Sequence, residues 1–272
     1  MLRIFDSHAH YYDGRFDKEA EGGSEAILRT VMPSPVARIL NVGTNCETSR
    51  AAIAQAKKYE GMYAAAGIHP EDCHLLGDPD AALKELSEML CDEDARRENK
   101  IVALGEIGLD YHWQFYGEIP MDKQKQAYFF EAQMNLARQY SLPVIIHDRE
   151  AHGDCFETVL RHPEVTGVFH SYSGSGEMAR ELVRRGWYIS FSGSLTFKNA
   201  ERVREAARAV PRDKLLVETD APYLAPHPMR GKLNHSGLLT YTLGTLAEVW
   251  GCTVEEAAEQ TYNNAERLFL SK

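Results

Sequence analysis

Eight short apolar runs recur along the chain, and each ends in polar or small residues. The runs begin near Ile4, Ala37, Met62, Ile101, Pro143, Gly167, Trp187 and Leu215. Several are rich in β-branched residues and show no alternation with polar positions. Strands of a parallel sheet have this composition because both of their faces are buried. The pattern therefore predicts eight buried parallel strands.

Helical periodicity lies between most of these runs. Residues 81–98 place Leu83, Leu86 and Leu90 on one stripe, and residues 123–140 repeat apolar residues at helical spacing. Further amphipathic helices are predicted over 177–185, 199–209, 238–249 and 254–269. Residues 111–122 are expected to form a loop at the active site.

Alternating strands and helices over 272 residues predict a (β/α)8 TIM barrel that forms a single domain over residues 1–272. The alternative is a doubly wound open sheet. That fold usually has fewer strands, and no G-x-G-x-x-G motif follows the first predicted strand here.

Composition places the chain among ordinary globular proteins, with 44% hydrophobic and 26% charged residues. No run approaches the roughly 18 apolar residues of a membrane span. The first residues turn polar too soon for a signal peptide. The five cysteines are scattered and lack a C-x-x-C pair, so we expect a reducing cytoplasm rather than a disulfide framework. The composition predicts no membrane association, and no obligate protein partner is evident.

Chemically active residues collect where the predicted strands end. These residues are His8 and His10, His69, Glu106 and Asp110, His147, His170, and Glu218 and Asp220. In a barrel the carboxyl ends of all strands meet at one mouth, where active sites lie. His8 and His10 are two residues apart on a strand, so both side chains point to the same face.

This coincidence predicts a metal site. A single histidine is more often a hydrogen-bonded core or rim residue, but here histidines and carboxylates converge from several strand ends. Such ligands suit Zn, Mn, Fe or Co, and Mg less well. Four histidines and two carboxylates suffice for two ions, with Glu106 between the two sets. Two ions can activate a shared water, which points to hydrolysis of a phosphoester or an amide.

Cationic residues on the loops after the later strands are candidates for phosphate binding. Arg149, Lys198 and Arg230 have this position, although a solvated surface charge explains each of them equally well. The net charge of −10 counts against binding of nucleic acid by side chains alone, but not against binding through metal ions. The aromatic residues within 111–122 could stack bases, but we expect them to cover the barrel mouth.

With these residues in place, the sequence resembles the TatD family of metal-dependent deoxyribonucleases from residue 4 to about 269. The motifs that carry the resemblance are DSHAH (6–10), AAGIHP (65–70), GEIGLDY (105–111), LPVIIHDREA (142–151), FHSYSG (169–174), ETDAPYLAP (218–226) and RGKLN (230–234). The chain departs from the family pattern where His235-Ser236-Gly237 replaces the usual Glu-Pro or Gln-Pro, and in the loop over 111–122.

The resemblance implies a barrel of the metallo-dependent hydrolase superfamily with two divalent ions, Zn, Mn or Mg. His8 and His10 would hold one ion and His147 and His170 the other, and Glu106 would bridge them. Asp220 would lie beside the nucleophilic water. Asp220 and Glu106 are therefore the expected catalytic residues, and Asp220 is also counted among the ligands. His69, Arg149, Lys198 and Arg230 are the expected substrate contacts.

The sequence thus predicts a deoxyribonuclease that cleaves DNA from a single-stranded end with a metal-activated water, as a 3′–5′ exonuclease does. One alternative is a hydrolase of the same fold that acts on an amide, a lactone or another ester. Another is a metal-binding partner protein without turnover. Asp220 argues against the latter, because a structural metal site needs no open position.

Overall fold

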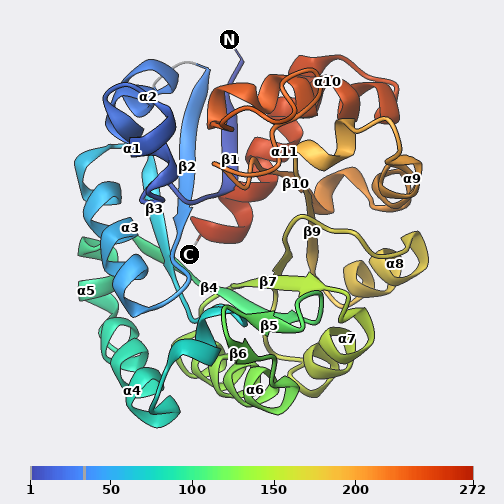
Figure 1. Ribbon diagram of the computed structural model, residues 1–272. Helices are drawn as coiled ribbons and strands as arrows, with labels where there is room; N and C mark the ends of the chain where they lie inside the picture. The colour runs from blue at the N-terminus through green and yellow to red at the C-terminus, as the bar shows by residue number, and fades with distance from the viewer. Residues whose placement is uncertain (1, 33–34, 272) are drawn as a thin grey trace.

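Eight parallel strands form one nearly closed barrel in the computed structural model, which describes residues 2–32 and 35–271. The strands are β1 (Ile4–Ala9), β2 (Val36–Val42), β3 (Met62–Ala66), β4 (Ile101–Asp110), β7 (Val144–Arg149), β8 (Gly167–Phe169), β9 (Tyr188–Phe191) and β10 (Leu215–Val217). They pair in chain order, with helices on the outside (Figure 1). The TIM barrel prediction is confirmed.

Backbone contacts just beyond β10 return the chain to β1. Ala9 forms a parallel bridge with Ala221, and the amide of His10 donates to the Ala221 carbonyl at 2.7 Å. The amide of Asp220 donates to the carbonyl of His8 at 2.9 Å. These contacts exclude a doubly wound open sheet, and they occur among the predicted site residues.

Helices cover the outer face of the barrel. They are α1 (Arg15–Glu19), α2 (Gly23–Val31), α3 (Cys46–Lys58), α4 (Pro79–Leu90), α5 (Glu93–Glu98), α6 (Lys123–Tyr140), α7 (His152–Arg161), α8 (Gly176–Arg184), α9 (Glu201–Ala209), α10 (Leu239–Trp250) and α11 (Val254–Phe269). In the part of the chain that is described, no helix has the length and apolar character to cross a membrane.

The helix predicted over 81–98 is wrong in one respect, because the structure has two helices there. The α4 helix ends at Leu90, and the side chain of Asp92 accepts a hydrogen bond from the amide of Ala95 to begin α5. An aspartate at this position favours a new helix start over continuation.

The barrel interior is packed below the mouth. Each strand contributes an inward residue, among them Phe5, Ile145 and Leu216, to one buried cluster. The α11 helix adds Tyr262 and Phe269, whose ring centroids each lie 6.2 Å from that of Phe5. The amino-terminal end is therefore filled with apolar side chains, and chemistry is confined to the opposite end.

The segment over 111–122 is more ordered than the expected loop. It contains the antiparallel pair β5 (Phe115–Tyr116) and β6 (Ile119–Pro120), here called the β5–β6 hairpin. Trp113 is 46% exposed and Phe115 57% exposed. These two side chains therefore do not form the packed cover over the mouth that we expected.

A buried carboxylate braces β1 against the segment that departs from the family pattern. Asp6 accepts hydrogen bonds from the hydroxyls of Thr219 and Ser236, both at 2.6 Å. Burial raises the pKa of Asp6 to about 6, and these hydrogen bonds oppose that rise. The hydroxyl of Tyr11 also lies 2.8 Å from that of Ser236. The His235-Ser236-Gly237 segment thus supports β1, which carries His8 and leads directly to His10.

Ser236→Ala should lower the free energy of unfolding by about 1–3 kcal/mol, because Asp6 loses a donor in a buried site. Urea denaturation would measure the change. The control is Ser271→Ala at an exposed position, expected within about 0.5 kcal/mol of the unchanged protein. Equal stability of the two variants would contradict the bracing role of Ser236.

Candidate metal centre

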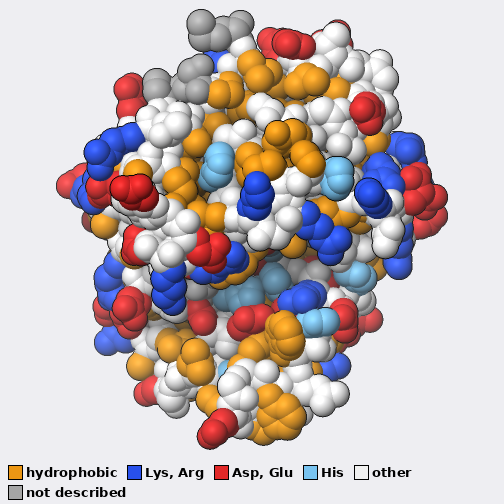
Figure 2. All heavy atoms as spheres, turned by 45° about the horizontal axis from the view of Figure 1, so that its top comes forward, with side chains coloured by type: hydrophobic (Ala, Val, Ile, Leu, Met, Phe, Trp, Pro, Cys, Tyr) orange, Lys and Arg blue, Asp and Glu red, His pale blue; other side chains and the backbone are white. Residues whose placement is uncertain are grey.

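The six predicted metal ligands converge at the carboxyl end of the barrel. His8 lies in β1 with His10 just after it, Glu106 lies in β4, and His147 lies in β7. The remaining two, His170 and Asp220, follow β8 and β10. Histidine side chains form the floor of a hollow in the molecular surface (Figure 2). The barrel thus brings together residues that are up to 212 positions apart.

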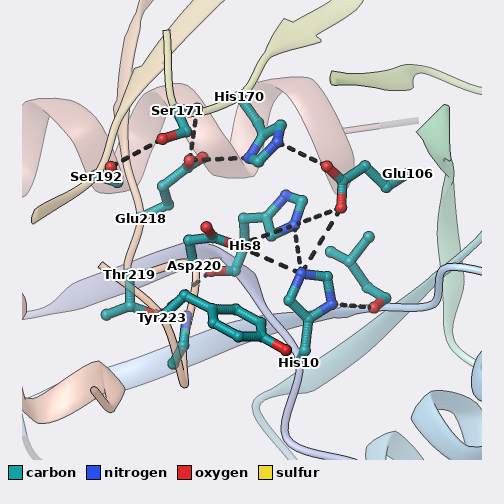
Figure 3. Close-up of polar contacts among 12 residues, drawn as sticks. His8, His10, Glu106, His170, Ser171, Ser192, Glu218, Thr219, Asp220 and Tyr223 are labelled. Atoms are coloured by element: carbon teal, nitrogen blue, oxygen red, sulfur yellow. Dashed lines mark hydrogen bonds and ion pairs between the residues drawn. The ribbon is translucent and has the colours of Figure 1, made fainter. Parts of the chain in front are cut away.

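Glu106 is the centre of the cluster. Its Oε1 lies 2.8 Å from His147 Nδ1 and 2.7 Å from His170 Nε2. Its Oε2 lies 3.2 Å from His8 Nε2 and 3.7 Å from His10 Nε2 (Figure 3). Burial opposes ionisation of Glu106, but the charges of His170 and its neighbours outweigh it and hold the pKa well below its usual value. Each oxygen of one ionised carboxylate therefore faces one histidine pair.

The first pair is completed by Asp220. Its Oδ1 lies 3.4 Å from His10 Nε2 and 3.9 Å from His8 Nε2, and the two Nε2 atoms are 3.1 Å apart. His10 Nδ1 lies 2.7 Å from the carbonyl oxygen of Val42. A carbonyl only accepts, so Nδ1 carries the proton and the lone pair on Nε2 points into the cluster.

The second pair is oriented by two carboxylates outside the cluster. Asp110 Oδ2 lies 3.0 Å from His147 Nε2, and Glu218 Oε1 lies 3.2 Å from His170 Nδ1. In the neutral imidazoles the outer nitrogen carries the proton, and the inner one offers a lone pair to the side of Glu106. This carboxylate–histidine arrangement is typical of protein metal sites.

Asp110 and Glu218 were predicted to lie at strand ends, with no role in the site. For Asp110, the spacing from Glu106 could have indicated a place in the site. Asp110 is four residues from Glu106 within β4, and residues at even spacings share a face of a strand. Glu218 and Asp220 follow β10, where the backbone no longer alternates, so their spacing gives no such signal.

The donor set fits divalent cations. Lone pairs of His8, His10 and Glu106 converge, as do those of His8, His170 and Asp220, with all candidate ligand atoms of a group within 4.8 Å of one another. His8 Nδ1 is buried and has no hydrogen-bond partner among the described residues. The inward lone pairs of the histidines and the carboxylate oxygens are all acceptors. Acceptors that face each other repel unless a proton or a metal ion lies between them. Imidazole and carboxylate ligands suit zinc and manganese.

His69 differs from the histidine ligands in what its ring presents to the cluster. The amide of Glu71 donates to His69 Nδ1 at 3.1 Å, so the proton of the neutral ring is on Nε2. That nitrogen lies 3.5 Å from Glu106 Oε1. Distance alone groups His69, Glu106 and His147 as possible ligands. The tautomer instead favours a hydrogen-bond donor, which agrees with the predicted substrate contact.

The three cationic candidates lie at different places. Arg149 ends β7 and lies 4.0 Å from Asp110 Oδ2, with its guanidinium 5.4 Å from the centre of the Trp113 ring. Arg230 and Lys198 are exposed, and the guanidinium of Arg230 lies over the ring of Phe197. Within the described chain, neither contacts the six ligand candidates through a hydrogen bond or an ion pair. The structure brings only Arg149 next to the cluster.

A nearly closed parallel barrel with histidines and carboxylates gathered at its mouth is the arrangement of a metal-dependent hydrolase. The family model "TatD related DNase" matches residues 5–270. Bacillus subtilis YabD, named an uncharacterized metal-dependent hydrolase, is 39% identical over 270 residues covering 98% of each chain. Mycobacterium tuberculosis TatD, named likewise, is 34% identical over 98% of this chain and 97% of its own. The crystal structure of the TatD homologue YjjV from Escherichia coli matches with a TM-score of 0.86 and 31% identity, covering 100% of this chain and 99% of that one.

The chain therefore belongs to the TatD-related family and is a metal-dependent hydrolase.

Asp110→Asn should weaken divalent metal binding about 10- to 100-fold, because the change removes the charge that orients His147. Calorimetric titration with Zn²⁺ or Mn²⁺ would measure the affinity. Asp213→Asn is the matched control, since Asp213 is exposed just before β10, at the opposite end of the barrel. Unchanged affinity in Asp110→Asn would show that this carboxylate does not support the site.

Metal binding should release protons at neutral pH. Burial lowers the pKa of His147, but hydrogen bonds to Asp110 and Glu106 outweigh this effect and raise it to about 9. Below that pH the metal-free ring is protonated, and an incoming ion must displace the proton. Affinity should then rise about tenfold per pH unit for each displaced proton, and level off near pH 9. Calorimetry in buffers of different ionisation enthalpy would count the protons; a count of zero at pH 7 would contradict this.

Proposed function

We propose that the protein is a divalent-metal-dependent phosphodiesterase that hydrolyses DNA from a single-stranded end. The observation that carries the proposal is the position of Glu106 between two histidine pairs, with one carboxylate oxygen toward each. His8, His10 and Asp220 would hold one ion and His147 and His170 the other. When bound, such ions activate water and neutralise charge on a phosphate. Zinc and manganese match the ligands best, and magnesium less well.

Asp220 is suited to orient the attacking water and take its proton. Burial raises the pKa of Asp220, but the contact with His10 and the charges of the nearby histidines outweigh burial and lower it, so the carboxylate is ionised. The backbone is left-handed here, with φ of 58°, and the amide is held by the carbonyl of His8. Aspartate and asparagine tolerate this conformation, so the carboxylate can be removed with little distortion.

His69 and Arg149 would bind the phosphate. The Nε2–H of His69 is directed to the cluster, and the guanidinium of Arg149 lies beside Asp110 at its edge. Lys198 and Arg230 could contact more distant phosphates of the strand. The net charge of −10 repels a long duplex, so a short single-stranded end is the better substrate. The free cysteines support a reducing cytoplasm as the setting.

Metal-free protein should not cleave end-labelled DNA, and adding Mg²⁺, Mn²⁺ or Zn²⁺ should restore cleavage. Asp220→Asn should then lower the rate by about 10²–10⁴, the usual effect of losing a general base. Product lengths on a gel distinguish removal of terminal nucleotides from internal cuts. Asp213→Asn serves as the active control.

Absence of cleavage with all three metals would contradict the proposal. Hydrolysis of an aryl ester or amide by the same preparation would then assign the centre to another bond.

A further inference from the structure

Large apolar side chains are exposed beside the metal centre. Trp113, Phe115 and Ile119 are 46%, 57% and 40% exposed, and they lie within seven consecutive residues. Leu75, the residue after His74 on which Tyr116 of the hairpin stacks, is 65% exposed. A cluster of this kind marks a binding surface more often than a scatter of single residues does.

The β5–β6 hairpin is firmly attached to the barrel. The ring of Tyr116 stacks on His74 with 4.5 Å between ring centres. Its hydroxyl donates to the carbonyl of Asp110 at 3.2 Å, and Gln126 donates to the same carbonyl at 2.8 Å. One face of the hairpin is thus fixed, while Trp113 and Phe115 remain in solvent. The exposure of Trp113 and Phe115 is therefore a feature of a segment that is packed against the barrel.

A short series of contacts joins this surface to the cluster. Asp110, whose carbonyl holds the hairpin, also holds His147 Nε2 through its carboxylate. The guanidinium of Arg149 lies between Asp110 and the ring of Trp113. It is 4.0 Å from Asp110 Oδ2 and 5.4 Å from the centre of the ring. His112 Nδ1 lies 2.6 Å from Glu150 Oε1 and fixes the start of the segment to the loop after β7. An aromatic ring and a cation are thus held at a set distance from the ligands.

We propose that Trp113 and Phe115 form a stacking surface for unpaired bases of a DNA strand whose phosphate is at the metal centre, with Arg149 between base and phosphate. This inference rests on the function proposed above. Aromatic side chains bind single strands with little sequence preference, because every base has a π-face. Arginine over an aromatic ring contributes to the same kind of site. The guanidinium of Arg149, next to the exposed rings of Trp113 and Phe115, fits a nucleic acid strand, which carries negative phosphates and flat bases.

Tryptophan fluorescence can report this binding directly. The chain has three tryptophans; Trp187 is buried in the core, and Trp250 lies in α10 with Arg212 over its ring. Titrating the metal-loaded Asp220→Asn protein with an eight-nucleotide thymidine strand should quench the emission of Trp113. An abasic strand of the same length and charge should bind about 5- to 150-fold more weakly for each stacked base lost.

Two variants separate stacking from a general change in the protein. In the Asp220→Asn background, Trp113→Ala should remove most of the difference between the two strands, and Trp113→Phe should retain it. Tyr241→Ala is the matched control, because Tyr241 is 41% exposed on α10 and should leave both affinities unchanged.

Equal affinity for the two strands would overturn the stacking proposal. If the active protein still cleaves DNA, the nuclease function stands without it, and the exposed hairpin is better explained as a protein contact. Preference for the thymidine strand without cleavage under any metal would support stacking and refute the nuclease function. If neither strand binds, both the stacking proposal and the nuclease function are refuted.

Discussion

The ionised Glu106 in the floor of the barrel mouth is the constraint to which the other site residues conform. A carboxylate in a buried position is costly unless charges or donors compensate it. Four imidazoles from β1, β7 and the end of β8 provide that compensation, two at each oxygen. Without metal, protons must lie between these groups, as the raised pKa values of His147 and His170 indicate. A metal ion and a proton compete for the same positions, so metal binding is coupled to the release of protons from the histidines.

Acceptors outside the cluster decide what each histidine can do. Val42, Asp110 and Glu218 take the outer protons of His10, His147 and His170, so three lone pairs point inward. At His69 the outer partner is a backbone donor, and the ring presents a proton instead. The same residue type therefore serves as ligand or as donor according to one hydrogen bond on its far side. These bonds rely on the packed strands beneath, including the brace between Asp6 and Ser236.

The strand positions were predictable because buried strands appear as apolar runs in the sequence. The six convergent side chains were predictable because they stand at or just after the ends of those runs. The histidine tautomers were not, since they depend on partners as distant as Val42 is from His10. The division between α4 and α5 follows from one capping aspartate within a stretch of helical composition, which periodicity alone does not resolve. The β5–β6 hairpin was missed because its two-residue strands are too short for any alternation to appear. The exposed rings of Trp113 and Phe115 were expected to pack over the barrel mouth, because most large aromatic residues are largely buried.

Charge and geometry together limit the substrates that the mouth can accept. A net charge of −10 repels a polyanion at long range, and salt screens this repulsion beyond about 10 Å. For the proposed DNA substrate, attraction would then come from short-range groups at the mouth: metal ions when bound, Arg149 and the Nε2–H of His69. A strand end brings few phosphates into the repulsive field, whereas a duplex brings many. In the stacking proposal, the exposed rings next to the mouth would add binding energy that does not depend on charge. An acidic protein can therefore bind a nucleic acid end if rings and bound metal provide most of the affinity.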